Sequence, residues 1–268
     1  MRRWDLFCQN KGVYMIKKIL LCLTFFALAA CATQESKIAE YLKKNPKIIF
    51  DVIEDNPEQF LEVVNKAARK TQELQYSKQN AEMKQQQESQ LKNPLNPELT
   101  EEKLLFGSSK APIVIVEYAD FQCPACRMAH ESLKKIKEKY KDQVQFYYKN
   151  MPLDFHKMAM PAARYFEAVK SVNKEKAEKF FNLVFEQQNQ MRDESFLKKT
   201  IKQLGLNPQI ISEKLKSKDV ESNIASDMNE FQKFGFTGTP VIVVNGVALN
   251  GAQPPEVIEK IIEMTKKK

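Results

Sequence analysis

The sequence predicts an α/β domain that follows an all-helical N-terminal extension. Three observations predict this class. Residues 113–149 have the pattern strand, helix, strand; residues 155–234 carry helical periodicity; and residues 241–266 have the pattern of a β-hairpin followed by a helix. The chain has 268 residues, which is enough for one domain of ordinary size and an extension.

Residues 1–31 have the pattern of an export signal. Met15-Ile16-Lys17-Lys18 is a short positive start, and residues 19–30 are apolar except for Thr24. The run is shorter than the roughly 20 residues that a membrane-spanning helix needs, and it matches a signal-peptide core. It ends in the letters LAAC at Cys31, which resembles the bacterial lipobox. We therefore expect lipidation of Cys31; a cleavable signal or an uncleaved anchor is the alternative, and the start is Met1 or Met15.

Residues 32–95 are expected to be a helical extension. Residues 34–91 contain no glycine, and Asn45-Pro46 and Asn56-Pro57 each resemble an N-cap followed by proline in the first helical turn. The apolar faces of such short helices need a partner, which is either the main domain or a second copy of the chain. After Leu74 the apolar face fades, which favours a solvated helix or spacer; one helix from Pro57 to Leu91 would extend about 50 Å.

Residues 96–268 are expected to form the α/β domain, with a helical insertion at about 152–235. Residues 113–118 are mostly β-branched, as in a strand that is buried on both faces, and Asn245-Gly246 is a hairpin-turn signal. The expected elements, in chain order, are a strand at 113–118, a helix from about 123 to 139, a strand at 144–149, helices within 155–234, strands at 241–244 and 247–249, and a helix at 255–266.

The formal charge of +8 and the pI near 9.0 do not indicate a nucleic-acid partner. The lysines are scattered and alternate with Glu and Asp, and no basic stripe carries stacking aromatic residues. We interpret the charge as a solvated surface.

The five cysteines are Cys8, Cys22, Cys31, Cys123 and Cys126. Removal of the leader and lipidation of Cys31 would leave only the last two as thiols, so an exported chain would lack a disulfide framework. The pair lies in a Cys-Pro-Ala-Cys motif that follows a strand and opens a helix. The free N–H groups and the dipole of a helix N-terminus favour a thiolate at Cys123. Cys126, one turn later, is placed to resolve a mixed disulfide.

Residues 112–130 (PIVIVEYADFQCPACRMAH) resemble the active-site strand and helix of the DsbA-like thioredoxin superfamily. Residues 236–241 (FTGTPV) are similar to the family segment in which a cis-proline faces the CxxC motif, and residues 147–153 (YYKNMPL) match its second strand and following loop. The resemblance implies a thioredoxin fold with a helical insertion, thiol:disulfide oxidoreductase activity and no cofactor. Residues 38–46 are similar to the oligomerisation region of dimeric or trimeric relatives such as the ScsC type, which implies a homo-oligomer through residues 34–91.

The resemblance also implies roles for individual residues. Pro240 would be the cis-proline, and Thr239 before it would border the cysteines. Both, together with Pro124 and Ala125, are expected to contact substrate. Glu117 would be a buried acid that relays a proton to or from Cys126, whereas a surface glutamate is the alternative.

Several alternatives stay open. Structural zinc needs four ligands, and only His130, His156 and the leader cysteines remain as candidates, so no metal is expected. A structural disulfide in a lipoprotein scaffold is the other interpretation of the motif. For the neighbouring residues, His130 is expected to be a satisfied packing histidine rather than to tune the thiols. His156 is expected to be a surface or helix-start residue, and Met128 to be in the core. Tyr118, Phe121 and Phe236 are either an apolar rim or core residues.

The implied partners are exported proteins with thiols or disulfides, an unidentified redox partner, and a membrane through the lipid on Cys31. The implied location is the periplasmic side of a bacterial cell envelope; Ala32, where retained lipoproteins often have Asp, favours the outer membrane. Oxidation, reduction and isomerisation all remain open. The extension and Thr239 favour isomerase or reductase behaviour.

Overall fold

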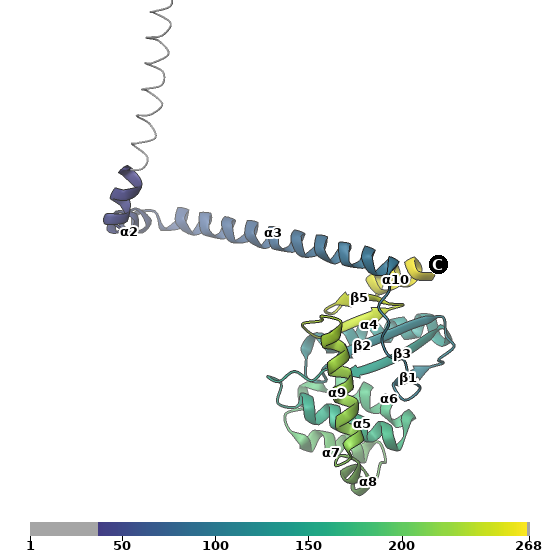
Figure 1. Ribbon diagram of the computed structural model, residues 1–268. Helices are drawn as coiled ribbons and strands as arrows, with labels where there is room; N and C mark the ends of the chain where they lie inside the picture. Colours follow the sequence, from purple (N-terminus) through teal and green to yellow (C-terminus); the bar gives the residue numbers. More distant parts are fainter. Residues whose placement is uncertain (1–36, 267–268) are drawn as a thin grey trace, which may run out of the picture. The chain divides into compact units, whose positions relative to one another are not determined.

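The computed structural model describes residues 37–266 (Figure 1). The chain divides into two compact units, residues 1–79 and 80–268. This division falls inside a long helix, earlier than the end of the predicted extension at residue 95. The predicted signal and Cys31 lie outside the described residues.

The described part of the first unit, residues 37–79, is helical, as predicted. Residues 37–44 are helical, α2 spans Lys47–Asp55, and α3 (Pro57–Lys92) begins at the predicted proline. With 36 residues, α3 is one helix of about 54 Å. Every residue of α2 is exposed or half-buried. The unit's exposed large apolar residues are Ile38, Tyr41, Ile48, Ile49, Phe50, Val52, Phe60, Leu61, Val63, Val64, Leu74 and Tyr76.

The second unit contains a five-stranded mixed sheet in the order β1-β3-β2-β4-β5 (Figure 1). Its strands are β1 (Leu104–Gly107), β2 (Ile113–Ala119), β3 (Val144–Asn150), β4 (Val241–Val244) and β5 (Val247–Asn250). β2 and β3 are parallel, and the other neighbours are antiparallel. The predicted strands are confirmed to within a residue, but the sequence analysis missed β1.

Helices pack against both faces of the sheet. They are α4 (Pro124–Tyr140), α5 (Ala159–Val172), α6 (Lys174–Glu186), α7 (Glu194–Gln203), α8 (Pro208–Lys214), α9 (Lys218–Lys233) and α10 (Pro255–Lys266), with short 3-10 turns at Lys141–Gln143 and Gln188–Gln190. Alternate residues of β2 point to opposite faces. Ile115 joins the larger core with α4, α6 and α10, whereas Val116 joins the smaller core with Phe231 of α9. The predicted α/β class, helical insertion and helical extension are confirmed.

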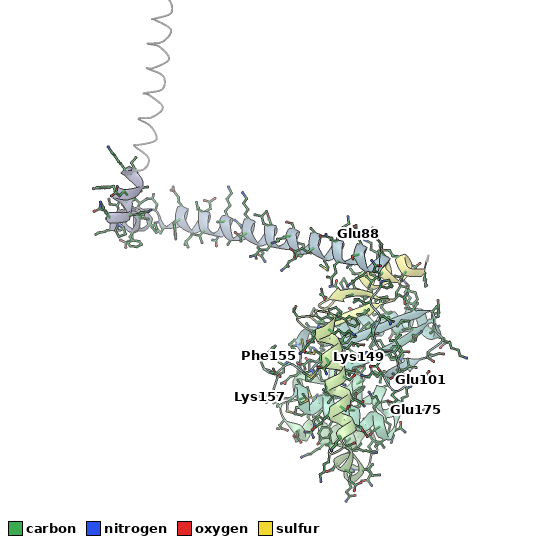
Figure 2. The ribbon with its side chains drawn as sticks, viewed as in Figure 1. Glu88, Glu101, Lys149, Phe155, Lys157 and Glu175 are labelled. Atoms are coloured by element: carbon green, nitrogen blue, oxygen red, sulfur yellow. The ribbon has the colours of Figure 1, made fainter. Side chains whose placement is uncertain are left out.

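An ion pair between a buried lysine and a half-buried glutamate attaches α9 to the sheet. The ammonium of Lys149, which lies within the domain at α9 (Figure 2), pairs with the carboxylate of Glu230. The hydroxyl of Tyr118 donates to the same carboxylate at 2.5 Å. Burial lowers the pKa of Lys149, and the bond to Glu230 opposes that shift. Tyr118 of β2, Lys149 of β3 and Glu230 of α9 therefore join these three elements.

Candidate active site

The two cysteines lie where β2 passes into α4. Cys123 is the N-cap of α4, and Pro124 occupies the first helical turn, where its missing N–H is not needed. The N–H groups of Cys126 and Arg127 donate to the Cys123 carbonyl at 3.1 and 3.2 Å, which closes the first turn. Both thiols are free and buried. The predicted placement of the pair at a strand-to-helix junction is therefore confirmed.

The surroundings of Cys123 favour its thiolate. A hydrogen bond from the Cys126 thiol lowers the pKa of Cys123 to about 5, against the opposing effect of burial. Backbone groups of Cys126 and Ala125 and the side chain of Thr239 lower this pKa further. In its thiol form, Cys123 Sγ contacts the Thr239 carbonyl at 3.6 Å. A thiolate predominates at neutral pH, and the thiolate is the attacking species in disulfide exchange.

Cys126 has the opposite character. Its side chain is fully buried, and burial followed by the hydrogen bond to Cys123 raises its pKa far above the usual value for a thiol. The Asp120 N–H donates to Cys126 Sγ at 3.4 Å, which offsets part of that shift. Cys126 therefore holds its proton while Cys123 has lost its own.

Glu117 lies on β2, six residues before Cys123, and is 0% exposed. Neither of its carboxyl oxygens has a hydrogen-bond partner within residues 37–266. Burial raises the pKa of Glu117 to about 8, and its charge contributes to the raised pKa of Cys126. The predicted burial of this acid is confirmed, and the surface alternative is wrong.

Thr239 and Pro240 approach Cys123 from the start of β4. Their peptide bond is cis, as the resemblance implied. Pro240 is buried, and the Thr239 hydroxyl oxygen is buried without a hydrogen-bond partner in the described part of the chain. Pro124 is exposed and Ala125 is half-buried beside the thiols. The structure thus brings Cys123 and Thr239 together, with Pro124 at the surface.

The turn between β2 and α4 is held by a carboxylate that the sequence analysis missed. Asp120 is buried and accepts hydrogen bonds from the N–H groups of Gln122 and Leu153 at 2.7 and 3.0 Å. Its Oδ2 also lies 2.6 Å from His156 Nδ1. His156 is half-buried rather than a plain surface residue, because the loop after β3 folds back onto this turn. Neighbouring Phe155 and Lys157 are exposed on the same loop (Figure 2).

The structure settles the roles of the other neighbouring residues. Met128 is 63% exposed, so its predicted core position is wrong; the buried stripe of α4 runs through Cys126, Ala129, His130 and Leu133 instead. His130 packs, as predicted, with its ring stacked 5.2 Å from that of Phe185. Its Nε2 is buried without a hydrogen-bond partner within residues 37–266, so the expectation that its polar atoms are satisfied is wrong.

The open alternatives for the three aromatic residues resolve in favour of the core. Tyr118, Phe121 and Phe236 are all buried. They pack against other rings of the two cores rather than forming an exposed apolar rim.

Residues 37–266 show no group of three or more His, Cys, Asp or Glu that could hold a metal ion. Within the same range, no helix combines the length and apolar character needed to cross a bilayer.

A family model described as thioredoxin matches residues 99–264. The chain belongs to the thioredoxin family. Within that superfamily, the resemblance to DsbA-like thiol:disulfide oxidoreductases is confirmed. A probable disulfide bond formation protein D of Bacillus cereus is 31% identical over 155 residues, which cover 54% of this chain and 70% of the relative.

Two solved structures show the same fold. The oxidised form of BdbD from Bacillus subtilis matches this thioredoxin-family chain with a TM-score of 0.57 at 24% identity, covering 65% of this chain and 99% of that one. The catalytic domain of ScsC from Proteus mirabilis matches with a TM-score of 0.52 at 22% identity, covering 61% and 88%.

Proposed function

We propose that Cys123 and Cys126 form the redox couple with which this enzyme exchanges disulfides with exported proteins. The observation that carries the proposal is the opposite effect of one environment on two neighbouring thiols. Cys123 is a thiolate at neutral pH, whereas Cys126 retains its proton. A nucleophile and a resolving thiol need this difference.

The exchange proceeds through a mixed disulfide. In the reducing direction, the Cys123 thiolate attacks one sulfur of a substrate disulfide, and the other substrate sulfur leaves as a thiolate. Cys126 then loses its proton and attacks the Cys123 sulfur, which forms the enzyme disulfide and releases the second substrate thiolate. Two electrons pass to the substrate. The same steps in reverse oxidise a substrate dithiol.

Glu117 is proposed to take up the proton of Cys126. The thiol lies in a buried environment from which bulk water is excluded, so its proton needs a nearby acceptor. Glu117 is the buried acid whose charge acts on Cys126, and a pKa of about 8 allows it to gain and lose a proton near neutral pH.

Thr239, Pro240, Pro124 and Ala125 are proposed to contact the substrate. The Thr239 carbonyl lies beside Cys123 Sγ, and its hydroxyl is free to donate to the thiolate. Pro124 and Ala125 lie between the cysteines in the chain and are exposed and half-buried, so both can be reached by a substrate.

We propose that the enzyme acts mainly as an oxidant. A couple is strongly oxidising when its reduced form is stabilised, and a pKa of about 5 for Cys123 stabilises the reduced form. This argument outweighs the isomerase or reductase behaviour suggested by the extension and Thr239. The relative named as a disulfide bond formation protein supports the same direction.

The location and the assembly state belong to the same proposal. The leader pattern supports export to the periplasmic side of a bacterial envelope, with an anchor at Cys31 and, from Ala32, the outer membrane. The exposed apolar residues of the first unit support a homo-oligomer, because single copies would leave those faces in water.

The test is the equilibrium of the chain without residues 1–31 against glutathione buffers, with Cys123→Ser as the control. We expect a reversible two-electron transition in the native chain and none in the variant. A midpoint of about −120 mV would support an oxidant, and one of about −270 mV would support a reductant. Absence of exchange in the native chain would contradict the proposal and favour a lipoprotein scaffold with an inactive pair.

A further inference from the structure

Gln188 reaches the redox centre from the helical insertion. It lies in the 3-10 turn Gln188–Gln190, directly after α6, and is 8% exposed. Its side-chain nitrogen donates to the carbonyl of Phe121 and to the carbonyl of Cys123, both at 2.9 Å. Both hydrogens of the amide are therefore used on the two residues that surround Gln122 in the active-site turn.

Helices of the same insertion also pack against the ring of Phe121. The Phe121 ring lies 5.5 Å from Phe166, 5.1 Å from Phe185 and 5.0 Å from Tyr148, measured between centroids. Two of these rings come from α5 and α6 of the insertion. Phe121 is therefore fixed to the insertion through both its side chain and its carbonyl.

The bond to Cys123 has an electrostatic consequence. A carbonyl oxygen carries partial negative charge, so a bare carbonyl next to a thiolate disfavours the anion. The Gln188 N–H offsets that charge and adds a third donor to the N–H groups of Cys126 and Arg127. It also fixes the carbonyl of the Cys123–Pro124 peptide, on which the first turn of α4 closes.

We propose that Gln188 is a positioning residue of the redox centre, through which the helical insertion sets the backbone of Cys123 and the reactivity of its sulfur. The inference rests on the proposed function, since only an exchanging Cys123 gives this contact a chemical role. Gln188 acts on the reaction through the backbone of Cys123. The effect depends on the two hydrogen bonds that the Gln188 side-chain amide donates.

The informative variant is Gln188→Met, which keeps the length of the side chain and removes both donors. Loss of the donors weakens stabilisation of the thiolate, and therefore of the reduced form. We expect the equilibrium constant of the couple against glutathione to shift about three- to tenfold toward the more reducing side, where tenfold corresponds to about 30 mV. The pH midpoint for alkylation of Cys123 should rise in parallel.

Gln188→Glu is a second variant, in case the methionine disturbs folding. A carboxyl buried against two carbonyls and a thiolate keeps its proton, so it donates one hydrogen bond in place of two. We expect the same direction of change and a smaller shift than for methionine.

Gln190→Met is the matched control, because Gln190 belongs to the same 3-10 turn and is exposed. It should leave both the equilibrium and the alkylation profile unchanged. Denaturant unfolding of the oxidised forms separates the alternatives, since a merely structural role would lower stability and leave the redox equilibrium and pH midpoint as they are. That result in the Gln188 variants would overturn the inference, whereas absence of exchange in the native chain would instead overturn the proposed function.

Discussion

At the scale of single residues, burial and hydrogen bonding separate the chemistry of two identical side chains. Cys123 lies at the first turn of α4 and accepts stabilising contacts from Cys126, Ala125 and Thr239. Cys126 lies one turn deeper, where the same thiolate would be costly. Glu117 is buried, and burial raises its pKa to about 8, which is close to neutral pH. The pKa values of the three groups thus rise in the order Cys123, Glu117, Cys126.

Glu117→Gln should make the stability of the oxidised protein less dependent on pH. Unfolded, Glu117 titrates near the ordinary glutamate pKa of 4.5, whereas in the folded protein its pKa is about 8. The folded state therefore holds more protons between these values, and the native protein loses stability as pH rises through that window. Glutamine resembles the protonated acid and removes this loss, which is on the order of a few kcal/mol.

The measurement is guanidinium unfolding at pH 5, 7 and 9 of the disulfide form, in which neither thiol titrates. Glu175→Gln is the control, since Glu175 is an exposed glutamate of α6 (Figure 2). Glu175→Gln should show the same pH dependence of the free energy of unfolding as the native protein. Equal slopes for the native chain and Glu117→Gln would contradict the raised pKa.

Local sequence reveals some site residues and conceals others. Cys123, Cys126 and Pro240 belong to short motifs, and Glu117 interrupts an apolar strand. Gln188 is separated from Cys123 by 65 positions in the chain and belongs to a polar run that resembles a solvated turn. Its role arises only when the insertion folds back on the active-site turn. Met128 was misplaced because its apolar side chain lies outside the buried stripe of α4.

At the scale of elements, the half-buried carboxylate of Glu230 connects α9 to two strands. It accepts from Tyr118 of β2 and Lys149 of β3, and its other oxygen accepts from the Glu98 N–H at 2.6 Å. A buried lysine without its partner is an uncompensated charge.

Glu230→Ala should therefore destabilise the protein by about 3–5 kcal/mol, because it leaves Lys149 and the Tyr118 hydroxyl without this acceptor. Chemical unfolding at pH 7 measures the effect. Glu221→Ala is the matched control on the same helix: its ion pair with Arg164 is 3.4 Å long and exposed, so it should cost about 1 kcal/mol or less. A loss of similar size in both variants would argue against a buried role for Glu230.

Strands with a β-branched run were predictable from the sequence, and β1 was not. β2 and β4 each consist mostly of adjacent apolar residues, and the Asn245-Gly246 turn defines the hairpin between β4 and β5. β1 has only four residues and ends at Gly107. Its strand conformation depends on pairing with β3, which lies about 40 residues later in the chain, so residues 104–107 alone carry too little information.

At the scale of the whole molecule, the two units differ in how they bury apolar side chains. The second unit encloses two cores, the larger of which includes the cysteines. The first exposes apolar residues along the helix of residues 37–44, α2 and the beginning of α3. Helices of this kind gain stability mainly by packing an apolar face, so their sequence favours association between copies.

Light scattering should accordingly find the chain without residues 1–31 as an oligomer and the second unit, residues 80–268, as a monomer. The second unit should retain the glutathione equilibrium of the longer chain, because every contact described at the cysteines comes from within it. The double variant Phe60→Glu and Val64→Glu should dissociate the oligomer, because both residues are exposed and lie one turn apart on α3.

The matched double variant Lys66→Glu and Lys70→Glu adds the same side chains at exposed polar positions of α3 and should remain associated. If the longer chain is a monomer at micromolar concentration, the apolar faces of the first unit do not join copies of this chain, and the proposed homo-oligomer is wrong while the redox couple is unaffected.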